Sequence, residues 1–492
     1  MKKLKDVIVD GVILAGSEVN LSDISDNSKN VKEGSLFFAI KGTAVDGHNF
    51  VREVLEKGAC GVVVQDRQLA DFLVKNYPGK AVVLSENTRK TLSLSANRFF
   101  DEPSKGLKVI GITGTNGKTS VSNILAQFYE FAGCKVGVIG TINYRIGDEV
   151  ISAGHTTPDP INWFKTLKIF KEKGAEVVVA EVSSHALDQY RVYSTVFDGG
   201  IFTNLTQDHL DYHRSMEEYF KAKEKLFYQI LDFNKNPKAS VNYDDEYGRK
   251  IYEKFKDSFN MMSYGKTSPD FKIEDIKLSL SGTEFSFKYR DREGKVYTTL
   301  LGEFNIYNLS ASLSYLLIDN FDEGFLAEKA RFLKPVRGRF EVLSENGKTV
   351  VVDYAHTPDG VEKLLTSINQ IKKSRVITIF GAGGNRDKTK RPIMGKIAKS
   401  LSDIVVITSD NPRNEDPMDI INDILKGIED KTNVFVISDR EEAIKFGIEI
   451  AGEGDVVVIA GKGHETYQII KDKILPFDDL EIAKKYLRRD YV

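Results

Sequence analysis

The stretch LKVIGITGTNGKTSVSNILAQFYEFAG, residues 107–133, joins an apolar segment, a glycine-rich segment and a long helix-like segment. The apolar residues predict a buried strand, the glycines a turn, and the remainder a helix. Backbone N–H groups at a helix N-terminus that follows such a turn can bind phosphate oxygens. The stretch therefore predicts the first unit of a nucleotide-binding α/β domain.

Residues 111–120 of this stretch, GITGTNGKTS, depart at one position from the general phosphate-loop pattern G-x-x-x-x-G-K-[ST]. The pattern requires glycine at position 112, where this chain has Ile112, and the glycines instead recur every third residue. Lys118 can still reach the terminal phosphates of a nucleotide, and Thr119 can ligate Mg²⁺. We interpret the segment as a variant phosphate loop; the alternative is a glycine-rich turn that binds no phosphate.

The composition is that of a soluble globular enzyme, with 41% of the 492 residues hydrophobic and 28% charged. The 69 basic and 71 acidic residues leave a net charge of -2, which argues against a nucleic-acid partner. Asp6 and Asp10 interrupt the first apolar stretch, so we expect no signal peptide. Apolar runs stay shorter than the ~18 residues of a membrane span, and two cysteines cannot build a disulfide framework. We expect a cytoplasmic protein without membrane insertion.

Length and local patterns predict an α/β fold with three domains. The polar segments DEPSKG, 101–106, and LKPVRGRFE, 333–341, mark the boundaries. The expected domains are residues 1–105, 106–334 and 335–492. Short strands and helices alternate in the first domain, and the second turns β-rich at 271–302, where alternating hydrophobicity predicts antiparallel strands. In the third, apolar strands followed by helix-like segments predict a doubly wound sheet.

Four expected strands of the third domain end in polar clusters. They are VVVDYAHTPD (350–359), RVITIFGAGGNRDK (375–388), DIVVITSDNPR (403–413) and DVVVIAGKGHE (455–465). Open parallel sheets bind ligands at the carboxyl ends of their strands. One crevice is therefore expected to collect all four clusters.

Two clusters of the central domain suit a metal-bound nucleotide. Glu181 follows one expected strand, and His209 and His213 follow another. A carboxylate and an imidazole at neighbouring strand ends can share a divalent ion; taken singly, a surface acid and a core histidine are open alternatives. All seven histidines lie in such polar clusters, which favours a function for several of them. From the residues alone, the lysines of YFKAKEKLF, 219–227, indicate a solvated helix face.

Ten motifs occur in one order along the chain. They are GTNGKTS, EVSSHALDQYR, TNLTQDHLDYH, YFKAKEKLF, GEFNIYNLSAS, RGRFE, DYAHTPD, GGNRDKTKRP, DNPR and AGKGHE. In this order, and over a span from Ser28 to Glu465, they resemble the Mur ligases of peptidoglycan synthesis. The resemblance implies a small N-terminal α/β uridine-binding domain, a central P-loop ATPase-like α/β domain and a C-terminal Rossmann-like doubly wound domain. It also implies a monomer.

The resemblance further implies an ATP-dependent amide ligase of the third-amino-acid step. The D-glutamate side-chain carboxylate of UDP-N-acetylmuramoyl-L-alanyl-D-glutamate would take the γ-phosphoryl group of ATP, and the amine of meso-diaminopimelate would then displace phosphate. A carboxylate is a poor acyl donor until its oxygen becomes a leaving group, and cations must offset the charge at the reacting phosphate. ATP and two Mg²⁺ ions are the implied cofactors.

Motif positions assign the implied ATP and metal sites. The ATP contacts would be Gly114, Thr115, Asn116, Gly117, Lys118, Thr119, Ser120, Asn305, Asn308, Arg339, Asp353 and His356. The metal ligands would be Thr119, Glu181, His209 and Lys223 as a carbamate, and the catalytic set Lys118, Glu181, His209 and Lys223. The family pattern here is Y-x-x-A-K-x-x-L-F. Aligned on Tyr219, Ala222, Leu226 and Phe227, it places the lysine at Lys223 and not at Lys221 or Lys225. Carbamylation would turn this amine into an anion able to bind metal.

The resemblance also implies contacts to the muramoyl substrate. They would come from Ser28, Thr43, His48, His155, Thr156, Thr157, Ser183, Gln189 and Arg191. Ser28 stands between Asn27 and Lys29 where the family has D-S-R, so the serine is kept while its neighbours differ. Arg191 suits a substrate carboxylate, because a planar guanidinium can pair with it through two hydrogen bonds.

The motif DNPR would read the acceptor amino acid. Arg413 would pair with the distal carboxylate of meso-diaminopimelate, and Asp410 and Asn411 would contact its ammonium. The implied pocket is Arg386, Asp410, Asn411, Pro412, Arg413, Gly461 and Glu465. L-Lysine lacks the distal carboxylate, and losing such a pair costs a few kcal/mol, about 100-fold in selection. meso-Lanthionine and L-lysine stay open as acceptors; alternatively, Arg413 caps a helix or pairs with Glu415 or Asp416.

Two other classes of protein compete with this interpretation. A related superfamily ligase, such as another Mur ligase or folylpolyglutamate synthetase, is disfavoured by the combination of HTTPDP, DNPR and GKGHE. A non-catalytic P-loop switch would not need a diamino-acid pocket, and the chain has no Asn-Lys-x-Asp guanine-reading motif. Phosphate release that depends on the amino acid separates a catalyst from a switch.

Overall fold

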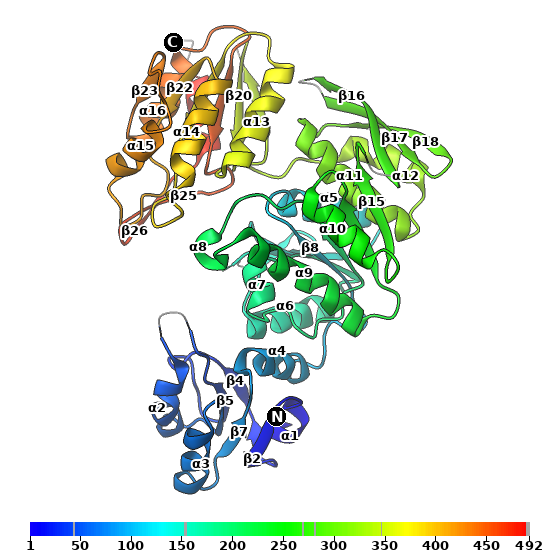
Figure 1. The fold of residues 1–492 in the computed structure, drawn as a ribbon, viewed down its shortest axis with the longest axis vertical. Coiled ribbons are helices and arrows are strands. Elements are labelled where there is room, and N and C mark those ends of the chain that lie inside the picture. Colours follow the sequence, from blue (N-terminus) through cyan, green and yellow to red (C-terminus); the bar gives the residue numbers. More distant parts are fainter. Residues whose placement is uncertain (43–44, 152–154, 268–269, 280–281, 346, 489–492) are drawn as a thin grey trace.

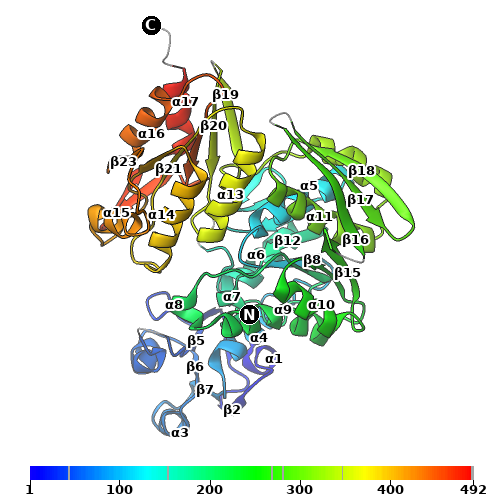
Figure 2. The ribbon, with the colours of Figure 1, turned by 45° about the horizontal axis from the view of Figure 1, so that its top comes forward.

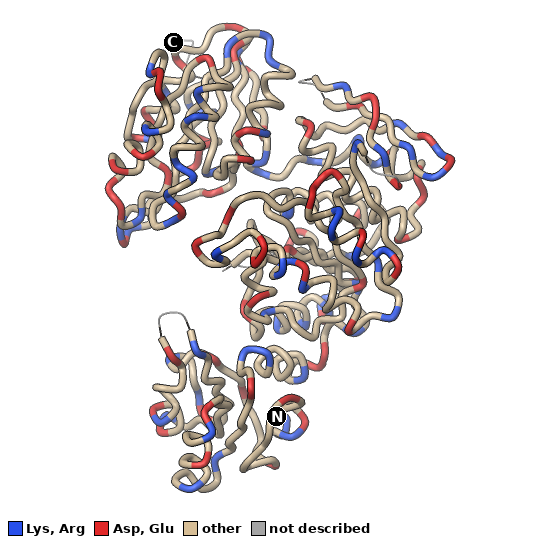
Figure 3. The backbone as a smooth tube through the Cα atoms, viewed as in Figure 1, with Lys and Arg blue, Asp and Glu red and all other residues tan. Residues whose placement is uncertain are grey.

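The computed structural model describes residues 1–42, 45–151, 155–267, 270–279, 282–345 and 347–488. Figure 1 shows three α/β bodies that follow one another along the chain, each built on its own main sheet. Basic and acidic residues are interspersed over all three bodies (Figure 3). Within the described residues, no helix is both long and apolar enough to cross a membrane.

The N-terminal body has a five-stranded sheet in the order β2-β7-β6-β5-β4. Its strands are β2 (Val12–Ala15), β4 (Asp23–Ser25), β5 (Ser35–Phe38), β6 (Gly61–Val64) and β7 (Ala81–Leu84), with a small pair of β1 (Lys2–Lys3) and β3 (Asn20–Leu21). Its helices are α1 (Leu4–Val7), α2 (Val51–Glu56), α3 (Arg67–Asn76) and α4 (Thr88–Phe99). Strands β4 to β7 are parallel, and β2 pairs antiparallel with β7. Helix α4 packs on α6 of the central body (Figure 1), which joins the two bodies.

The central body has an eleven-stranded sheet in the order β11-β10-β9-β12-β8-β13-β14-β15-β16-β17-β18. Its strands are β8 (Lys108–Thr113), β9 (Val136–Ile139), β10 (Tyr144–Ile146), β11 (Glu149–Ile151), β12 (Val177–Glu181), β13 (Gly199–Phe202), β14 (Lys238–Asn242), β15 (Asn260–Gly265), β16 (Phe271–Ser279), β17 (Gly282–Tyr289) and β18 (Arg292–Thr298). Its helices are α5 (Lys118–Phe131), α6 (Pro160–Glu172), α7 (Ser184–Asp188), α8 (Leu210–His213), α9 (Met216–Phe233), α10 (Glu246–Phe255), α11 (Glu303–Ile318) and α12 (Glu323–Lys329). The antiparallel pairing of β16, β17 and β18 confirms the prediction for residues 271–302.

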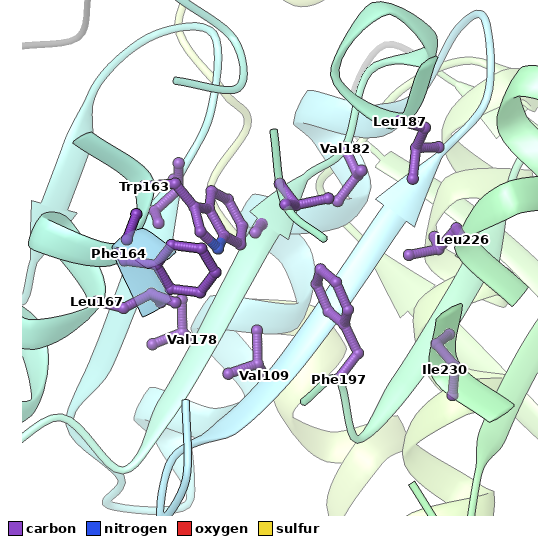
Figure 4. Packing of buried hydrophobic residues seen from close by; sticks show 14 of the residues in the cluster. Val109, Trp163, Phe164, Leu167, Val178, Val182, Leu187, Phe197, Leu226 and Ile230 are labelled. Atoms are coloured by element: carbon purple, nitrogen blue, oxygen red, sulfur yellow. The ribbon is translucent and has the colours of Figure 1, made fainter. Parts of the chain in front are cut away.

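Strand β8 is buried on both faces because its alternate side chains enter different apolar clusters. Val109 packs in one cluster with Trp163 and Phe197 (Figure 4). Ile110 and Ile112 pack in the other, which α5 and α11 also line. Each fully buried aliphatic side chain contributes roughly 1.5–3 kcal/mol. The apolar run of β8 therefore anchors the glycine-rich turn that follows it.

The C-terminal body has a six-stranded sheet in the order β19-β20-β24-β21-β22-β23. Its strands are β19 (Glu341–Glu345), β20 (Lys348–Asp353), β21 (Val376–Phe380), β22 (Ile404–Ile407), β23 (Val434–Val436) and β24 (Val456–Ala460), followed by the hairpin of β25 (Tyr467–Ile470) and β26 (Lys473–Pro476). Its helices are α13 (Pro358–Ile371), α14 (Lys390–Leu401), α15 (Pro417–Leu425), α16 (Arg440–Glu449) and α17 (Asp479–Leu487). All strands but β19 are parallel in this sheet, which confirms the predicted doubly wound pattern. Figure 2 shows α13 on the side that faces the central body, and α13 contacts α11 there.

Candidate active site

The phosphate loop begins two residues later than the general pattern suggests, because β8 ends at Thr113 and Gly114 is the first residue of the turn. Strand β8 continues through Ile112, which pairs with Glu181 of β12 and Ile201 of β13, so a glycine has no role at this position. At Gly117 the backbone has φ = 90°, and a Cβ would lie 2.5 Å from Oδ1 of Asn308. Only glycine fits both constraints. The turn thus delivers the chain into the N-terminus of α5 without a side chain over the expected phosphate position.

Two lysines converge on one carbonyl of this turn. The Nζ of Lys118 donates to the carbonyl oxygens of Gly114 and Thr115 at 2.8 and 2.9 Å. The Nζ of Lys223, from α9, donates to the same Gly114 oxygen at 2.7 Å. Burial lowers the pKa of both amines, and the charge of Lys118 lowers that of Lys223 further.

Burial of Lys223 corrects the expectation of a solvated lysine face. Only 1% of Lys223 is exposed, whereas the side chain of Lys221 on the same helix is 66% exposed. The expectation is therefore right for Lys221 and wrong for Lys223. A neutral amine is the nucleophilic form of lysine, which is the form that carbamylation by CO₂ requires.

Glu181 and His209 line the same cavity as the phosphate loop; Glu181 is the last residue of β12, and His209 directly precedes α8. Glu181 is 1% exposed, and its carboxylate accepts hydrogen bonds from the backbone N–H and the hydroxyl of Thr141, both at 2.9 Å. His209 follows β13 with φ = 55°, and its Nε2 lies 3.5 Å from Oδ2 of Asp208. Burial lowers the pKa of His209, which keeps the imidazole neutral and able to act as a metal ligand.

The side chains beside the phosphate loop could supply only some of the ligands of a Mg²⁺ ion. Among the residues that the structure describes, no group of three or more His, Cys, Asp and Glu side chains is placed to hold a metal ion. Mg²⁺ keeps several waters and takes one or two carboxylates together with substrate phosphates. Glu181, with the Thr119 hydroxyl, matches that pattern.

A cavity of about 360 Å³ lies between the central and C-terminal bodies. Expected ATP residues in its lining are Asn116, Gly117, Ser120, Asn308, Arg339, Asp353 and His356. The amide of Asn116 donates to Oδ2 of Asp359 at 2.7 Å, which ties the loop to α13. Asn305 does not line the cavity; its Oδ1 accepts from the amide of Asn308 at 3.1 Å and so orients that residue.

A second cavity, of about 310 Å³, joins the phosphate loop to the strand ends of the C-terminal sheet. From the central body it is lined by Thr115, Asn116, Gly117, Lys118, Thr119, Thr156, Glu181, Ser183 and His209. From the C-terminal body it is lined by Tyr354, His356, Gly381, Gly383, Arg386, Asp410, Asn411, Arg413, Gly461 and Glu465. All four polar strand ends thus meet in one crevice, as the parallel sheet requires.

Arg413 is held by backbone contacts rather than by an acid. Its Nη1 donates to the carbonyl of Gly384 at 2.8 Å, and its backbone, with φ = 53°, bonds to both Ile469 and Lys471. Glu415 pairs instead with Arg391, at 2.9 Å. Within the described part of the chain no carboxylate lies in ion-pair range of Arg413. Its guanidinium therefore faces the cavity with its charge unpaired.

Asn411 and Glu465 form a linked pair on the floor of this pocket. The Nδ2 of Asn411 donates to Oε2 of Glu465 at 2.7 Å, and Lys462 donates to the same oxygen at 3.0 Å. Lys462 is fully buried and also donates to Oδ1 of Asn411 at 3.2 Å. Pro412 does not line the cavity; its carbonyl lies where a Cβ on Gly384 would be.

The expected muramoyl contacts divide among three regions, the first of which is the second cavity, lined by Thr156 and Ser183. His155, Gln189 and Arg191 line a cavity of about 190 Å³ between the N-terminal and central bodies. Thr157 does not line this cavity; its hydroxyl donates to the carbonyl of Glu181 at 2.8 Å, and its own carbonyl accepts from Arg191 at 2.9 Å. Ser28 and His48 lie in the N-terminal body, and Thr43 lies outside the described residues. His48 is already engaged, with Nδ1 2.6 Å from Asp46 and Nε2 accepting from the Gln65 N–H.

Several lining residues escaped the sequence analysis. They are Arg89, Asp208, Asp244, Tyr264, Tyr307 and Lys390. The buried Lys462, which donates to Asn411, was missed as well. Four of these residues stand inside quoted motifs, so their polar setting was a usable signal: Asp208, Tyr307, Lys390 and Lys462. Tyr264 lies in an ordinary strand and Arg89 near the start of an ordinary helix. Nothing local distinguishes those two from structural residues.

Three family models match the chain in order. The Mur ligase family, catalytic domain, matches residues 21–100; the Mur ligase middle domain matches 112–316; and the Mur ligase, glutamate ligase domain matches 338–463. These models, in this order along the chain, place the protein in the class of ATP-dependent ligases. Within that class, the chain belongs to the Mur ligase family.

Named relatives extend over nearly the whole chain. A UDP-N-acetylmuramoyl-L-alanyl-D-glutamate--2,6-diaminopimelate ligase of Aquifex aeolicus is 48% identical over 94% of this chain and 93% of its own. One from Clostridium acetobutylicum is 43% identical over 99% of each chain. A solved structure of a ligase with the same name has a TM-score of 0.71 at 30% identity, covering 99% of this chain and 98% of its own. A folylpolyglutamate synthase of Mycobacterium tuberculosis, at 15% identity and a TM-score of 0.64 over 81% of this chain and 95% of its own, shares the fold alone.

Proposed function

We propose that this chain adds meso-diaminopimelate to the D-glutamate side-chain carboxylate of UDP-N-acetylmuramoyl-L-alanyl-D-glutamate, in the cytoplasm and at the expense of ATP. The observation that carries the proposal is the shared cavity, in which the phosphate loop and Arg413 line the same space. The names of the Aquifex and Clostridium relatives support the same substrates. We assign one ligand to each domain. Residues 1–105 would bind the muramoyl nucleotide, residues 106–334 ATP, and residues 335–492 the amino acid.

The phosphoryl step would use the loop and its neighbours. The N-terminus of α5 and Lys118 would bind the ATP phosphates, and Arg339 would add a charge from the C-terminal body, since its Nη2 already lies 3.4 Å from the Thr119 hydroxyl. The D-glutamate carboxylate attacks the γ-phosphorus and ADP leaves, which gives an acyl phosphate. The acceptor amine then attacks the acyl carbon and gives up a proton to solvent, the new C–N bond forms, and inorganic phosphate carries away the C–O electron pair.

Mg²⁺ would neutralise charge on the transferred phosphoryl group when bound. We propose Thr119, Glu181, His209 and a carbamate on Lys223 as its protein ligands, over two ion positions. Burial and the charge of Lys118 lower the pKa of the Lys223 amine, which supports the carbamate because only an unprotonated amine can attack CO₂. The Thr141 hydrogen bonds hold Glu181 with one orientation toward the loop.

The unpaired guanidinium of Arg413 favours an acceptor with a distal carboxylate. Such a carboxylate would pair with it bidentately, while L-lysine would leave the charge unpaired. meso-Lanthionine carries the same two amino acid ends and is the second candidate acceptor on this ground.

Phosphate release tests the proposal. Purified protein is supplied with Mg²⁺-ATP and UDP-N-acetylmuramoyl-L-alanyl-D-glutamate, and meso-diaminopimelate, meso-lanthionine and L-lysine are compared as acceptors. We expect release with the first, or the first two, and little with lysine. Equal use of lysine contradicts the role of Arg413, and no release with any acceptor contradicts ligase activity itself.

A further inference from the structure

A buried ion pair lies directly behind the acceptor pocket. Arg440, the first residue of α16, and Asp479, the first residue of α17, have fully buried side chains. The Nε and Nη2 of Arg440 donate to the two carboxylate oxygens of Asp479 at 2.8 and 2.7 Å. Two parallel hydrogen bonds of this kind fix the plane of the guanidinium.

The remaining donors of this guanidinium bind two strand ends. Nη1 donates to the carbonyl of Ser409 at 3.3 Å, after β22, and Nη2 donates to the carbonyl of Ala460 at 3.0 Å, at the end of β24. In the sheet, β22 and β24 are not neighbours, because β21 lies between them. Arg440 therefore spans the end of β21 and sets the distance between two strand tips that share no ladder hydrogen bonds.

The residues that follow these two carbonyls belong to the acceptor pocket. Asp410 follows Ser409, and Gly461, with φ = 117°, follows Ala460. A Cβ on Gly461 would lie 2.7 Å from Oδ2 of Asp410, so the two strand tips already approach each other as closely as a glycine allows. A small change in the tip separation would move the Asp410 carboxylate relative to Gly461.

The charge of Arg440 also reaches the pocket. Burial disfavours the charged guanidinium, but Asp479, Asp410 and Glu465 together outweigh burial and raise the pKa of Arg440. A buried ion pair adds little net stability compared with apolar side chains of the same volume. Here the ion pair instead fixes the positions of the two strand tips and places a positive charge beside them.

Resting on the proposed ligase function, we infer that Arg440, oriented by Asp479, is a positioning residue that sets the acceptor amino acid pocket by holding the strand tips before Asp410 and Gly461. It does not touch the acceptor. Its effect is expected on acceptor binding and not on ATP or the muramoyl nucleotide, whose residues lie on other elements.

The test compares Arg440→Lys and Asp479→Asn with Arg375→Lys. Arg375 forms an Arg–Asp pair with Asp455, at 2.6 Å, where β21 and β24 begin, at the end of the same sheet that is opposite to Arg440. We expect the KM for meso-diaminopimelate to rise roughly 10- to 100-fold in the first two variants, the effect of a misplacement of about 1 Å. The KM values for ATP and nucleotide should stay unchanged, and Arg375→Lys should alter none of them.

Direct binding separates this inference from the ligase proposal. Calorimetric titration of meso-diaminopimelate into each protein, with a non-hydrolysable ATP analogue and the nucleotide present, needs no turnover. If the wild type binds meso-diaminopimelate but releases no phosphate, the ligase proposal is contradicted. The inference about Arg440 is then supported if the Arg440 and Asp479 variants bind meso-diaminopimelate more weakly than the wild type does. Unchanged acceptor binding, or a parallel loss for all three ligands, overturns the inference, as does a wild type that binds no diamino acid.

Discussion

The Nζ of Lys223 and the Nζ of Lys118 both donate to the carbonyl oxygen of Gly114, at 2.7 and 2.8 Å. Two ammonium groups so close together inside a protein repel each other, and burial disfavours both charges. The pKa of Lys223 is accordingly lowered well below its ordinary value. A lowered pKa favours the unprotonated amine, which is the form that the proposed carbamylation needs.

Lys223→Ala should lower the rate of phosphate release by roughly 100-fold or more, because a metal ligand is lost. Acetate or bicarbonate should restore part of the activity by supplying a carboxylate in the vacated space. A ¹³C carbamate signal should appear in the wild type equilibrated with ¹³C-bicarbonate and be absent in the variant. Lys221→Ala, on the exposed face of α9, serves as the control and should behave as wild type. Full activity of Lys223→Ala contradicts the assignment.

Arg413→Ala should weaken the use of meso-diaminopimelate by about 100-fold in kcat/KM, the cost of a lost charge-assisted pair. The matched control is the substrate: L-lysine has no distal carboxylate, so its low activity should change little. Steady-state assays with both acceptors measure the ratio. An equal loss for both amino acids would mean that Arg413 only supports the loop through Gly384.

Gly117→Ala should lower ATP affinity at least roughly tenfold, which corresponds to a loss of about 1.4 kcal/mol in the free energy of ATP binding. The new Cβ would meet Oδ1 of Asn308 at 2.5 Å, so Asn308 or the loop must move. Gly133→Ala is a matched control at the other end of α5, since Gly133 has φ = 87° and no atom near its Cβ position. That variant should lose about 1 kcal/mol of stability from backbone strain and keep its ATP affinity. Fluorescence titration with an ATP analogue measures both.

Asp319→Asn should destabilise the central body in a pH-dependent way. Asp319 ends α11 and accepts from Lys108 and Lys238 at 2.6 Å and from the Tyr129 hydroxyl at 2.7 Å. Burial opposes ionisation of this carboxyl, but these hydrogen bonds outweigh it and lower the pKa of Asp319. Because the folded-state pKa lies below the unfolded value of about 4, the stabilisation is complete above that pH and is lost as pH falls through the folded-state pKa.

Urea unfolding at pH 7 and near pH 3 measures this effect. At pH 7 we expect a loss of about 2 to 3 kcal/mol, less than for a fully buried pair because both lysines are partly exposed. The difference between variant and wild type should shrink near pH 3. Glu246→Gln, which removes an exposed helical pair with Lys250, should leave the midpoint unchanged. A constant difference at both pH values would assign the effect to packing instead.

The fold and part of the site follow from local patterns. The apolar run of β8 and the glycines after it predicted a strand, a turn and a helix, and the structure has β8, the turn and α5 there. The four polar clusters predicted one crevice, because parallel strands bring their carboxyl ends to a single sheet edge. Such features depend on residues close together in the chain, which is why the sequence reveals them.

Burial and partner choice depend on segments far apart in the chain, and only the tertiary structure decided them. The lysines of YFKAKEKLF look alike in sequence, yet Lys221 faces solvent and Lys223 lies against Gly114, more than a hundred residues away. Glu415 is near Arg413 in sequence but pairs with Arg391.

Arg440 also shows the difference between what local sequence predicts and what long-range contacts decide. It stands in an ordinary helix start, SDREEAI, and its contacts reach Ser409, Ala460 and Asp479. The sequence by itself determined which elements form and which motifs end them, because periodicity and turn chemistry are local. The tertiary structure alone decided which charges are buried, neutral or unpaired, since those properties arise from the atoms that the fold packs around each group.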